Sequence, residues 1–209
     1  MTGKIKLPHS SGNSVSIAAP QSNPASDRTL YLPSNADGTV LTTTYAKAGN
    51  IIQVVQGIKK DTSSNSTSAT SYWNTDVTVA ITPSHASNKI LLTGYIQVGV
   101  AGPQHNIGVG IHKAGSLLTD YLGDSAGSRS RVGTNGDNMP DGGYTNAMGN
   151  IIFEYLDTAG GTSSITYGIA LRNPSSITRT LKINYAETDT DNIYHQRATS
   201  VITAMEVAV

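Results

Sequence analysis

The chain has 209 residues, enough for one substantial core plus an extension but too few for two full cores. Fourteen basic residues balance fourteen acidic ones, and charged residues make up only 13% of the chain, so no net field attracts nucleic acid or an anionic membrane. The absence of cysteine excludes disulfides, thiolate catalysis and cysteine-ligated metals. No segment approaches the roughly 18 to 20 apolar residues that cross a bilayer, and no signal-peptide stretch opens the chain. We therefore expect no nucleic-acid binding, no membrane insertion and synthesis in a cytoplasm without signal-directed export.

The first 49 residues predict an extended arm rather than a self-sufficient domain. Strand-like runs alternate there with Pro, Asn, Ser and Gly, and few side chains are large and apolar. Ordering costs about 1 to 2 kcal/mol per residue, against roughly 25 cal/mol for each Å² of apolar area buried. Such an arm becomes ordered by packing against identical arms or a neighbouring protein. Its candidate anchoring residues are Val15, Ile17, Leu30, Leu32, Val40 and Leu41.

Residues 50–209 predict one all-β domain. IIQVVQGIKK opens it, and a Ser/Thr-rich loop follows at residues 61–73. Alternation then places Val77, Val79 and Ile81 on one buried face, and Ile107, Val109 and Ile111 on another. Further strand candidates are KILLTGYIQVGV, SLLTDYL, NIIFEYLD, SSITYGIALRN, ITRTLKINYAE and RATSVITAMEVAV. With seven to nine turn-bounded strands and no convincing helix, we expect an antiparallel jelly-roll β-sandwich whose last strand is central.

The long Gly, Asn, Ser and Asp segment at residues 123–150 is the candidate recognition loop. Arg129, Arg131 and Tyr144 form its most plausible contact set, because Tyr and Arg are favoured in binding hot spots and an aromatic ring stacks on a sugar face. The alternative is that these side chains only fix the loop onto its own domain. Tyr72 and Trp73 are interpreted as core or subunit-interface residues.

No residue pattern predicts a catalytic or metal site. The five histidines have no metal-binding spacing, although His105 and His112 could meet symmetry mates on an oligomer axis. The ETDTDN segment and the group Asp137, Asn138 and Asp141 are interpreted as solvated turns rather than calcium loops. Glu154 and Asp157 are kept only as a possible glycosidase pair. We expect a non-enzymatic protein without cofactor or metal.

The arm sequences GNSVSIAAP and DRTLYLPSNADGTVLTT resemble those of tail-fibre-like and other virion structural proteins of tailed phages, particularly marine cyanobacterial phages. In that group a pattern S-V-x-I-x-A-P leads to T-L-x-L-P-x-x-x-G-T-V-L-x-T, matched here at residues 14–20 and 29–42. The closing strand SVITAMEVAV is similar to the end of C1q- or tumour-necrosis-factor-like jelly rolls, which form trimers.

The resemblance implies a homotrimeric structural protein of a phage virion, with the arm contacting capsid or tail proteins and the jelly roll facing outward. A short tail fibre or spike-like appendage for attachment to a host surface glycan or protein is the first expectation. A capsid decoration or cement protein is the alternative, because long fibres carry shaft repeats that this chain lacks. A carbohydrate-binding β-sandwich module is the second alternative.

Overall fold

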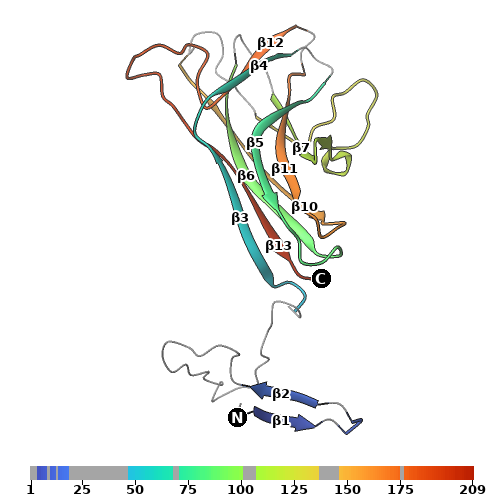
Figure 1. Ribbon diagram of the computed structural model, residues 1–209. Helices are drawn as coiled ribbons and strands as arrows, with labels where there is room; N and C mark the ends of the chain where they lie inside the picture. Colours follow the sequence, from blue (N-terminus) through green and yellow to red (C-terminus); the bar gives the residue numbers. More distant parts are fainter. Residues whose placement is uncertain are drawn as a thin grey trace, which may run out of the picture. The chain divides into compact units, whose positions relative to one another are not determined.

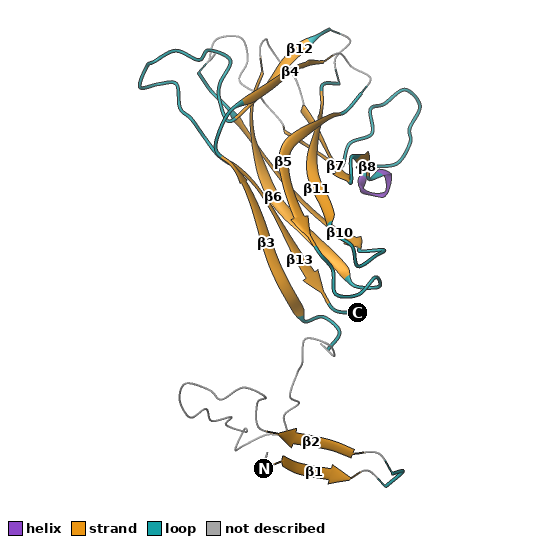
Figure 2. Ribbon diagram, viewed as in Figure 1, coloured by secondary structure: helices purple, strands orange, loops and turns teal. Residues whose placement is uncertain are grey.

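The computed structural model describes residues 4–8, 10–12, 14–18, 47–67, 71–100, 107–136, 146–174 and 177–209. Contacts along the chain divide it into two compact units, residues 1–40 and 41–209. Across the described residues the chain is all-β, and a single 3₁₀ turn, η1 (Thr119–Tyr121), is the only helical element (Figures 1 and 2). No helix in these ranges is long and apolar enough to cross a membrane.

The first unit contains one antiparallel hairpin. Strand β1 (Lys4–Pro8) pairs with β2 (Ser14–Ala18), and the register places Leu7 opposite Val15 and Ile5 opposite Ile17. Two of the predicted anchoring residues, Val15 and Ile17, thus belong to a strand. The other four, Leu30, Leu32, Val40 and Leu41, lie outside the described residues.

Two antiparallel sheets make up the second unit. The larger one is built around β6, which pairs along one edge with β10 and along the other with β13 and then β12; β13 also pairs with β3, and β12 with β4 (Figure 1). Its strands are β3 (Ile51–Lys59), β4 (Ser63–Thr67), β6 (Lys89–Val100), β10 (Gly149–Thr158), β12 (Arg179–Ile183) and β13 (Ser200–Val207). The expected central position of the last strand is confirmed, because β13 lies between β3 and β6.

The smaller sheet has the order β5, β11, β7, with β8 and β9 both on the far edge of β7. Its strands are β5 (Trp73–Ile81), β7 (Ile107–Lys113), β8 (Ser116–Leu117), β9 (Thr134–Gly136) and β11 (Ile165–Arg172).

The pairing order identifies a jelly roll. Leaving aside the added pair β4 and β12, the eight positions along the chain are β3, β5, β6, β7, then β8 with β9, β10, β11 and β13. The first pairs with the eighth, the second with the seventh, the third with the sixth, and the fourth with the fifth. This nesting is that of an antiparallel ribbon rolled into two sheets. The predicted all-β sandwich of jelly-roll type is therefore confirmed.

The core lies between the two sheets. Val77, Val79 and Ile81 on β5 are all buried there, as the alternation predicts, and so are the predicted inward residues of β7. Tyr167 of β11 is also fully buried, and its hydroxyl donates to the Asp157 carboxylate of β10 at 2.6 Å, which links the two sheets. Burial raises the pKa of the Tyr167 hydroxyl, and the neighbouring carboxylate raises it further.

Three local predictions need correction. The Ser/Thr-rich segment forms strand β4, because its backbone pairs with β12 although its side chains show no apolar alternation. SLLTDYL gives only the two-residue β8 before the chain turns into η1. Strand β9 lies inside the expected recognition loop and pairs with β7.

Candidate interaction surfaces

The outer face of the larger sheet carries apolar side chains in cross-strand rows. Because side chains alternate between faces and residues directly opposite share one face, the register defines these rows. From β10 through β6 and β13 to β3, the rows are Ile152, Tyr95, Val201, Ile58; then Glu154, Thr93, Thr203, Gln56; then Leu156, Leu91, Met205, Val54; and finally Thr158, Lys89, Val207, Ile51. We call this surface the outer face.

The outer face is unusually apolar for exposed surface. Ile152 is 68% exposed, Val54 56%, Ile58 52% and Leu156 51%. A grid of four strands by four outward positions, at about 4.8 Å and about 6.8 Å spacing, covers roughly 500 Å². Ten of the sixteen positions are apolar, and the largest apolar patch of a typical monomer, roughly 300 to 600 Å², is often functional.

The polar residues of the outer face are mostly neutral and locally bonded. Gln56 donates to the Thr203 hydroxyl at 3.0 Å, and Lys89 donates to the Thr158 hydroxyl at 2.7 Å. The four rows hold one acid, Glu154, and one base, Lys89, so the face has no net charge. It can therefore be covered without leaving an unbalanced charge buried.

A second candidate surface lies on the opposite side of the sandwich, on the outer side of the smaller sheet. Here the structure brings Arg129 and Arg131, two of the three predicted recognition residues, together with Arg172 of β11 at one pocket of about 590 Å³. Tyr144, the third predicted residue, lies outside the described residues. The rest of the lining includes Tyr72, Asn74, Leu117 and Leu122.

Glycines of β7 make room for this pocket. A Cβ on Gly110 would meet a Leu117 methyl carbon at 2.8 Å and the Tyr72 ring at 2.9 Å, so these two side chains lie directly on the strand. A Cβ on Gly108 would meet Val132 at 2.3 Å. The residues around the arginines are thus held against the sheet.

Hydrogen bonds fix the arginine-bearing loop. Arg131 donates from Nε to the Gly123 carbonyl at 2.6 Å, and the Tyr72 hydroxyl donates to the Arg131 carbonyl at 2.8 Å. Arg129 donates to the Ala126 carbonyl at 3.3 Å. Burial raises the pKa of the Tyr72 hydroxyl, although the positive charges of Arg172 and Arg131 act to lower it. Both readings of the loop arginines, contact set and loop fixation, therefore have a geometric basis.

Sequence reasoning missed Tyr72 and Arg172 as members of this pocket. Arg172 is opposite Gly108 in the β7–β11 register, and its guanidinium lies 5.8 Å from the Tyr72 ring centroid. The alternation of β11 could have placed Arg172 on the outer side, but nothing in the sequence indicates which loop lies above it.

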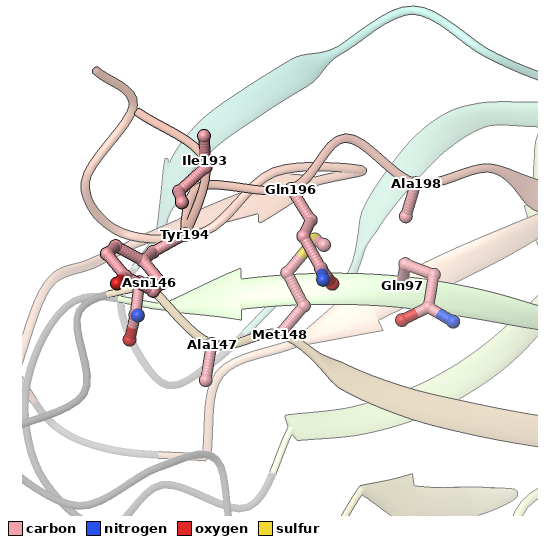
Figure 3. Close-up of a pocket in the computed structure, with 8 residues that line it drawn as sticks. All are labelled: Gln97, Asn146, Ala147, Met148, Ile193, Tyr194, Gln196 and Ala198. Atoms are coloured by element: carbon pink, nitrogen blue, oxygen red, sulfur yellow. The ribbon is translucent and has the colours of Figure 1, made fainter. Parts of the chain in front are cut away.

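Figure 3 shows a third surface, a pocket of about 520 Å³ where three segments meet. Gln97 comes from β6, Met148 from the segment before β10, and Ile193, Tyr194 and Gln196 from the segment before β13. Ile193 is 87% exposed. Among the described lining residues the Tyr194 hydroxyl is the only titratable group, and the others offer amide and apolar contact surface.

The other candidate groups do not assemble into a site in the described part of the chain. Glu154 lies on the outer face, whereas the Asp157 carboxylate points to the inner side and pairs with Lys113 at 2.8 Å, so the two cannot flank one glycosidic bond. Asp189 pairs with Arg197 at 2.7 Å. Among the described residues no three His, Asp or Glu side chains gather around a possible metal position.

His112 is buried on β7 and packs against Gly168 of β11. A Cβ added to Gly168 would lie 2.2 Å from the Nε2 atom of His112. Burial lowers the pKa of its imidazole, which favours the neutral form. His105 and the group Asp137, Asn138 and Asp141 fall outside the described residues. Trp73 packs against the core.

No family model and no curated protein matches the chain. Among solved structures, it is similar to a chain described as "Structure of infectious bursal disease virus Gt strain", with a TM-score of 0.34 and 11% sequence identity. The alignment covers 95% of this chain and 48% of the other, so this chain spans about half of its length. A likeness this distant carries no inference about this chain.

Proposed function

We propose that the chain is a non-enzymatic structural protein of a virus particle, which assembles as a homotrimer and serves in attachment at the particle surface. The observation that carries the proposal is the outer face, with its cross-strand rows of exposed Ile, Leu and Val on a rigid sheet. A biological interface clears about 500 Å² on each partner, and stable ones bury about 600 to 1,000 Å². The outer face, at roughly 500 Å², reaches the lower limit for a biological interface.

A second copy of this chain is the partner that fits the outer face best. The face is neutral, like the chain as a whole, and its polar row lies between two apolar rows. In a trimer the outer face of each copy packs beside the three-fold axis against a different surface of the next copy, where a neutral, largely apolar face is covered without an excess of like charge. Closed rotational symmetry then gives a finite oligomer, and the trimer is the one that the jelly-roll resemblance implies.

The virion assignment is supported by the arm. The pattern at residues 14–20 and 29–42 is the part of the chain that resembles tailed-phage virion proteins. In the proposed mechanism, the arms of one oligomer bind capsid or tail proteins together. Once one arm is bound, the other arms of the same oligomer are held at a high effective concentration near their own binding sites. The jelly roll then faces the host as a short tail fibre or spike.

The experiment that tests this mechanism is a deletion of residues 1–40, which form the first compact unit. The shortened chain should remain folded by circular dichroism and fail to join particles produced in its presence, whereas the full chain joins them. Normal incorporation of the shortened chain would contradict an anchoring role for the arm.

Copy number separates the two particle locations. Densitometry of purified particles giving a few tens of copies or fewer supports a tail appendage, and hundreds of copies support a capsid decoration or cement protein. The remaining alternative is a carbohydrate-binding module that belongs to no particle, and the arginine-lined pocket is the observation that favours it. Glycan binding by a full chain that never co-purifies with particles would support this alternative.

A further inference from the structure

We propose that the arginine-lined pocket of the smaller sheet binds an acidic saccharide, a sugar that carries carboxylate or sulfate groups, as found in surface polysaccharides. This inference rests on the proposed attachment function and names the ligand class for it. We define the pocket by Tyr72, Leu117, Leu122, Arg129, Arg131 and Arg172.

The pocket concentrates positive charge in a chain whose net charge is zero. The chain contains six arginines, and three of them line this pocket. Among the described residues no Asp or Glu lines the pocket, and neither Arg129 nor Arg131 forms an ion pair with a described carboxylate. An anion entering the pocket therefore finds, at Arg129 and Arg131, positive charge that no described carboxylate neutralises.

Carbonyl oxygens orient the guanidinium groups of Arg129 and Arg131 without neutralising their charge. The acceptors of Arg131 are the carbonyls of Gly123 at 2.6 Å and Thr119 at 3.4 Å, and that of Arg129 is the Ala126 carbonyl at 3.3 Å. A guanidinium has five N–H donors, so each keeps several for a ligand. Donors held in a fixed fork suit the paired oxygens of carboxylate and sulfate.

The remaining walls suit a sugar ring rather than a bare ion. Tyr72, Leu117 and Leu122 give the pocket apolar surface, which packs against the C–H faces of a sugar. Its volume, about 590 Å³, falls within the range of small-ligand sites and far exceeds the space of one inorganic anion. Asn74, also exposed at the rim, supplies an amide for ring hydroxyls.

The location leaves the pocket open in the assembled protein. Arg172 and the glycines beneath Tyr72 lie on the outer side of the smaller sheet, and the proposed subunit contact uses the outer side of the larger one. Three copies of the pocket on one trimer would give multivalent attachment to a repeating polymer.

Isothermal titration calorimetry of the full chain tests the proposal with four probes of known composition. These are a heparin-derived tetrasaccharide, a galacturonic acid tetrasaccharide, neutral maltotetraose and inorganic sulfate. We expect at least one acidic tetrasaccharide to bind at least tenfold more tightly than maltotetraose and than sulfate, with affinity that falls as salt is raised. A preference for the galacturonic acid tetrasaccharide identifies carboxylate as the group recognised, and a preference for the heparin-derived tetrasaccharide, which carries both groups, shows that sulfate contributes.

Variants locate the binding. Arg129→Gln combined with Arg172→Gln should weaken binding of the preferred probe at least tenfold, whereas Arg197→Gln removes the same type of charge outside the pocket and should leave it unchanged. Leu122→Glu places a carboxylate in the pocket without altering the arginines, and it should abolish binding. This variant tests the pocket independently of whether the double arginine variant folds.

Three results would overturn the proposal: no binding of either acidic tetrasaccharide, equal affinity for inorganic sulfate, or an equal loss in Arg197→Gln. Wild-type affinity in Leu122→Glu would overturn it as well. Light scattering on the same samples keeps this question apart from assembly. A trimer that binds no saccharide contradicts only the pocket, and a monomer that binds one contradicts only the proposed oligomer.

Discussion

At the scale of single residues, Glu206 shows how the sandwich accommodates a buried charge. It lies on β13 with no exposed surface, and its carboxylate accepts hydrogen bonds from the Gln53 amide at 2.6 Å, the Asn88 amide at 2.6 Å, and both the backbone N–H and the hydroxyl of Ser84 at 2.7 Å. Burial acts to raise the pKa of this carboxyl, but the donors outweigh it and lower the pKa to about 2. The turn between β5 and β6 is thereby fastened to β13.

Glu206→Gln should destabilise the fold and change its pH dependence. The pKa of Glu206 is lower in the folded chain than its ordinary value of 4.5, so its contribution is complete above pH 4.5 and disappears as the pH falls toward 2. The difference corresponds to about 3 kcal/mol at neutral pH. Urea unfolding at one protein concentration, at pH 7, 4 and 3, should show the wild type losing stability in this window and the variant losing less.

In Glu206→Gln, the amide N–H₂ group of the new side chain faces N–H and O–H donors that bonded to the carboxylate. The variant should therefore also be less stable than the wild type at pH 7. A second variant, Glu154→Gln, removes an exposed carboxylate from strand β10 of the same sheet and serves as the control. Parallel pH profiles for the wild type and Glu206→Gln would show that another group governs acid unfolding.

Residue-level predictability from the sequence was good for apolar positions and poor for buried polar ones. Alternation alone places Val77 and Ile107 in the core. Nothing in the sequence indicates that Asn184 adopts a φ of 67° and donates to the carbonyls of Lys59 and Asp61. Such roles depend on which strand ends meet in the folded chain, which is a tertiary property.

At the scale of elements, β3 and β5 belong to different sheets but approach closely at Gly57. An added Cβ there would lie 1.9 Å from the Thr78 carbonyl oxygen, which is backbone and cannot swing aside. Gly57 therefore permits the contact that closes this edge of the sandwich.

Gly57→Ala should lower the free energy of unfolding by about 1 to 3 kcal/mol or more, because the two strands must separate to admit the methyl group. Gly161→Ala is the matched control, since its Cβ would meet nothing within 4 Å. Thermal and urea unfolding of both variants check the prediction. Equal stability of the two would mean that β3 and β5 adjust freely at this edge.

Element prediction succeeded where the apolar pattern carried the information. The runs that became β5, β6, β7, β10, β11 and β13 are all visible in the sequence. Strand β4 is not, because SSNST has no apolar side chain and is held by backbone pairing with β12. The arginine-lined pocket was predicted in part, since Arg129 and Arg131 come from one loop, whereas Arg172 joins them only through the β7–β11 register.

At the scale of the whole molecule, the proposed trimer contact through the outer face predicts the mass of the protein in solution. The wild type should scatter light with about three times the chain mass of 21.8 kDa. Leu156→Asp combined with Val54→Asp places two charges in one apolar row and should shift the mass toward that of a single chain, because each charge would be buried in the contact.

Ile193→Asp is the control for this experiment, because Ile193 is a still more exposed apolar residue in a different segment. It should keep the wild-type mass. A wild-type mass of a single chain at micromolar concentration, or an equal shift in both variants, would contradict assembly through the outer face.

The place of β13 in the larger sheet also sets the order in which this protein can fold as it is made. Strand β3 finds its only described partner in β13, and about 140 residues separate Lys59 from Ser200. At about 5 to 20 residues per second, the ribosome needs roughly 7 to 28 seconds to deliver that partner. Throughout this interval the backbone N–H and C=O groups of β3 lack their strand partner. Neighbouring nascent chains on one mRNA can therefore pair through their β3 strands before any subunit is complete.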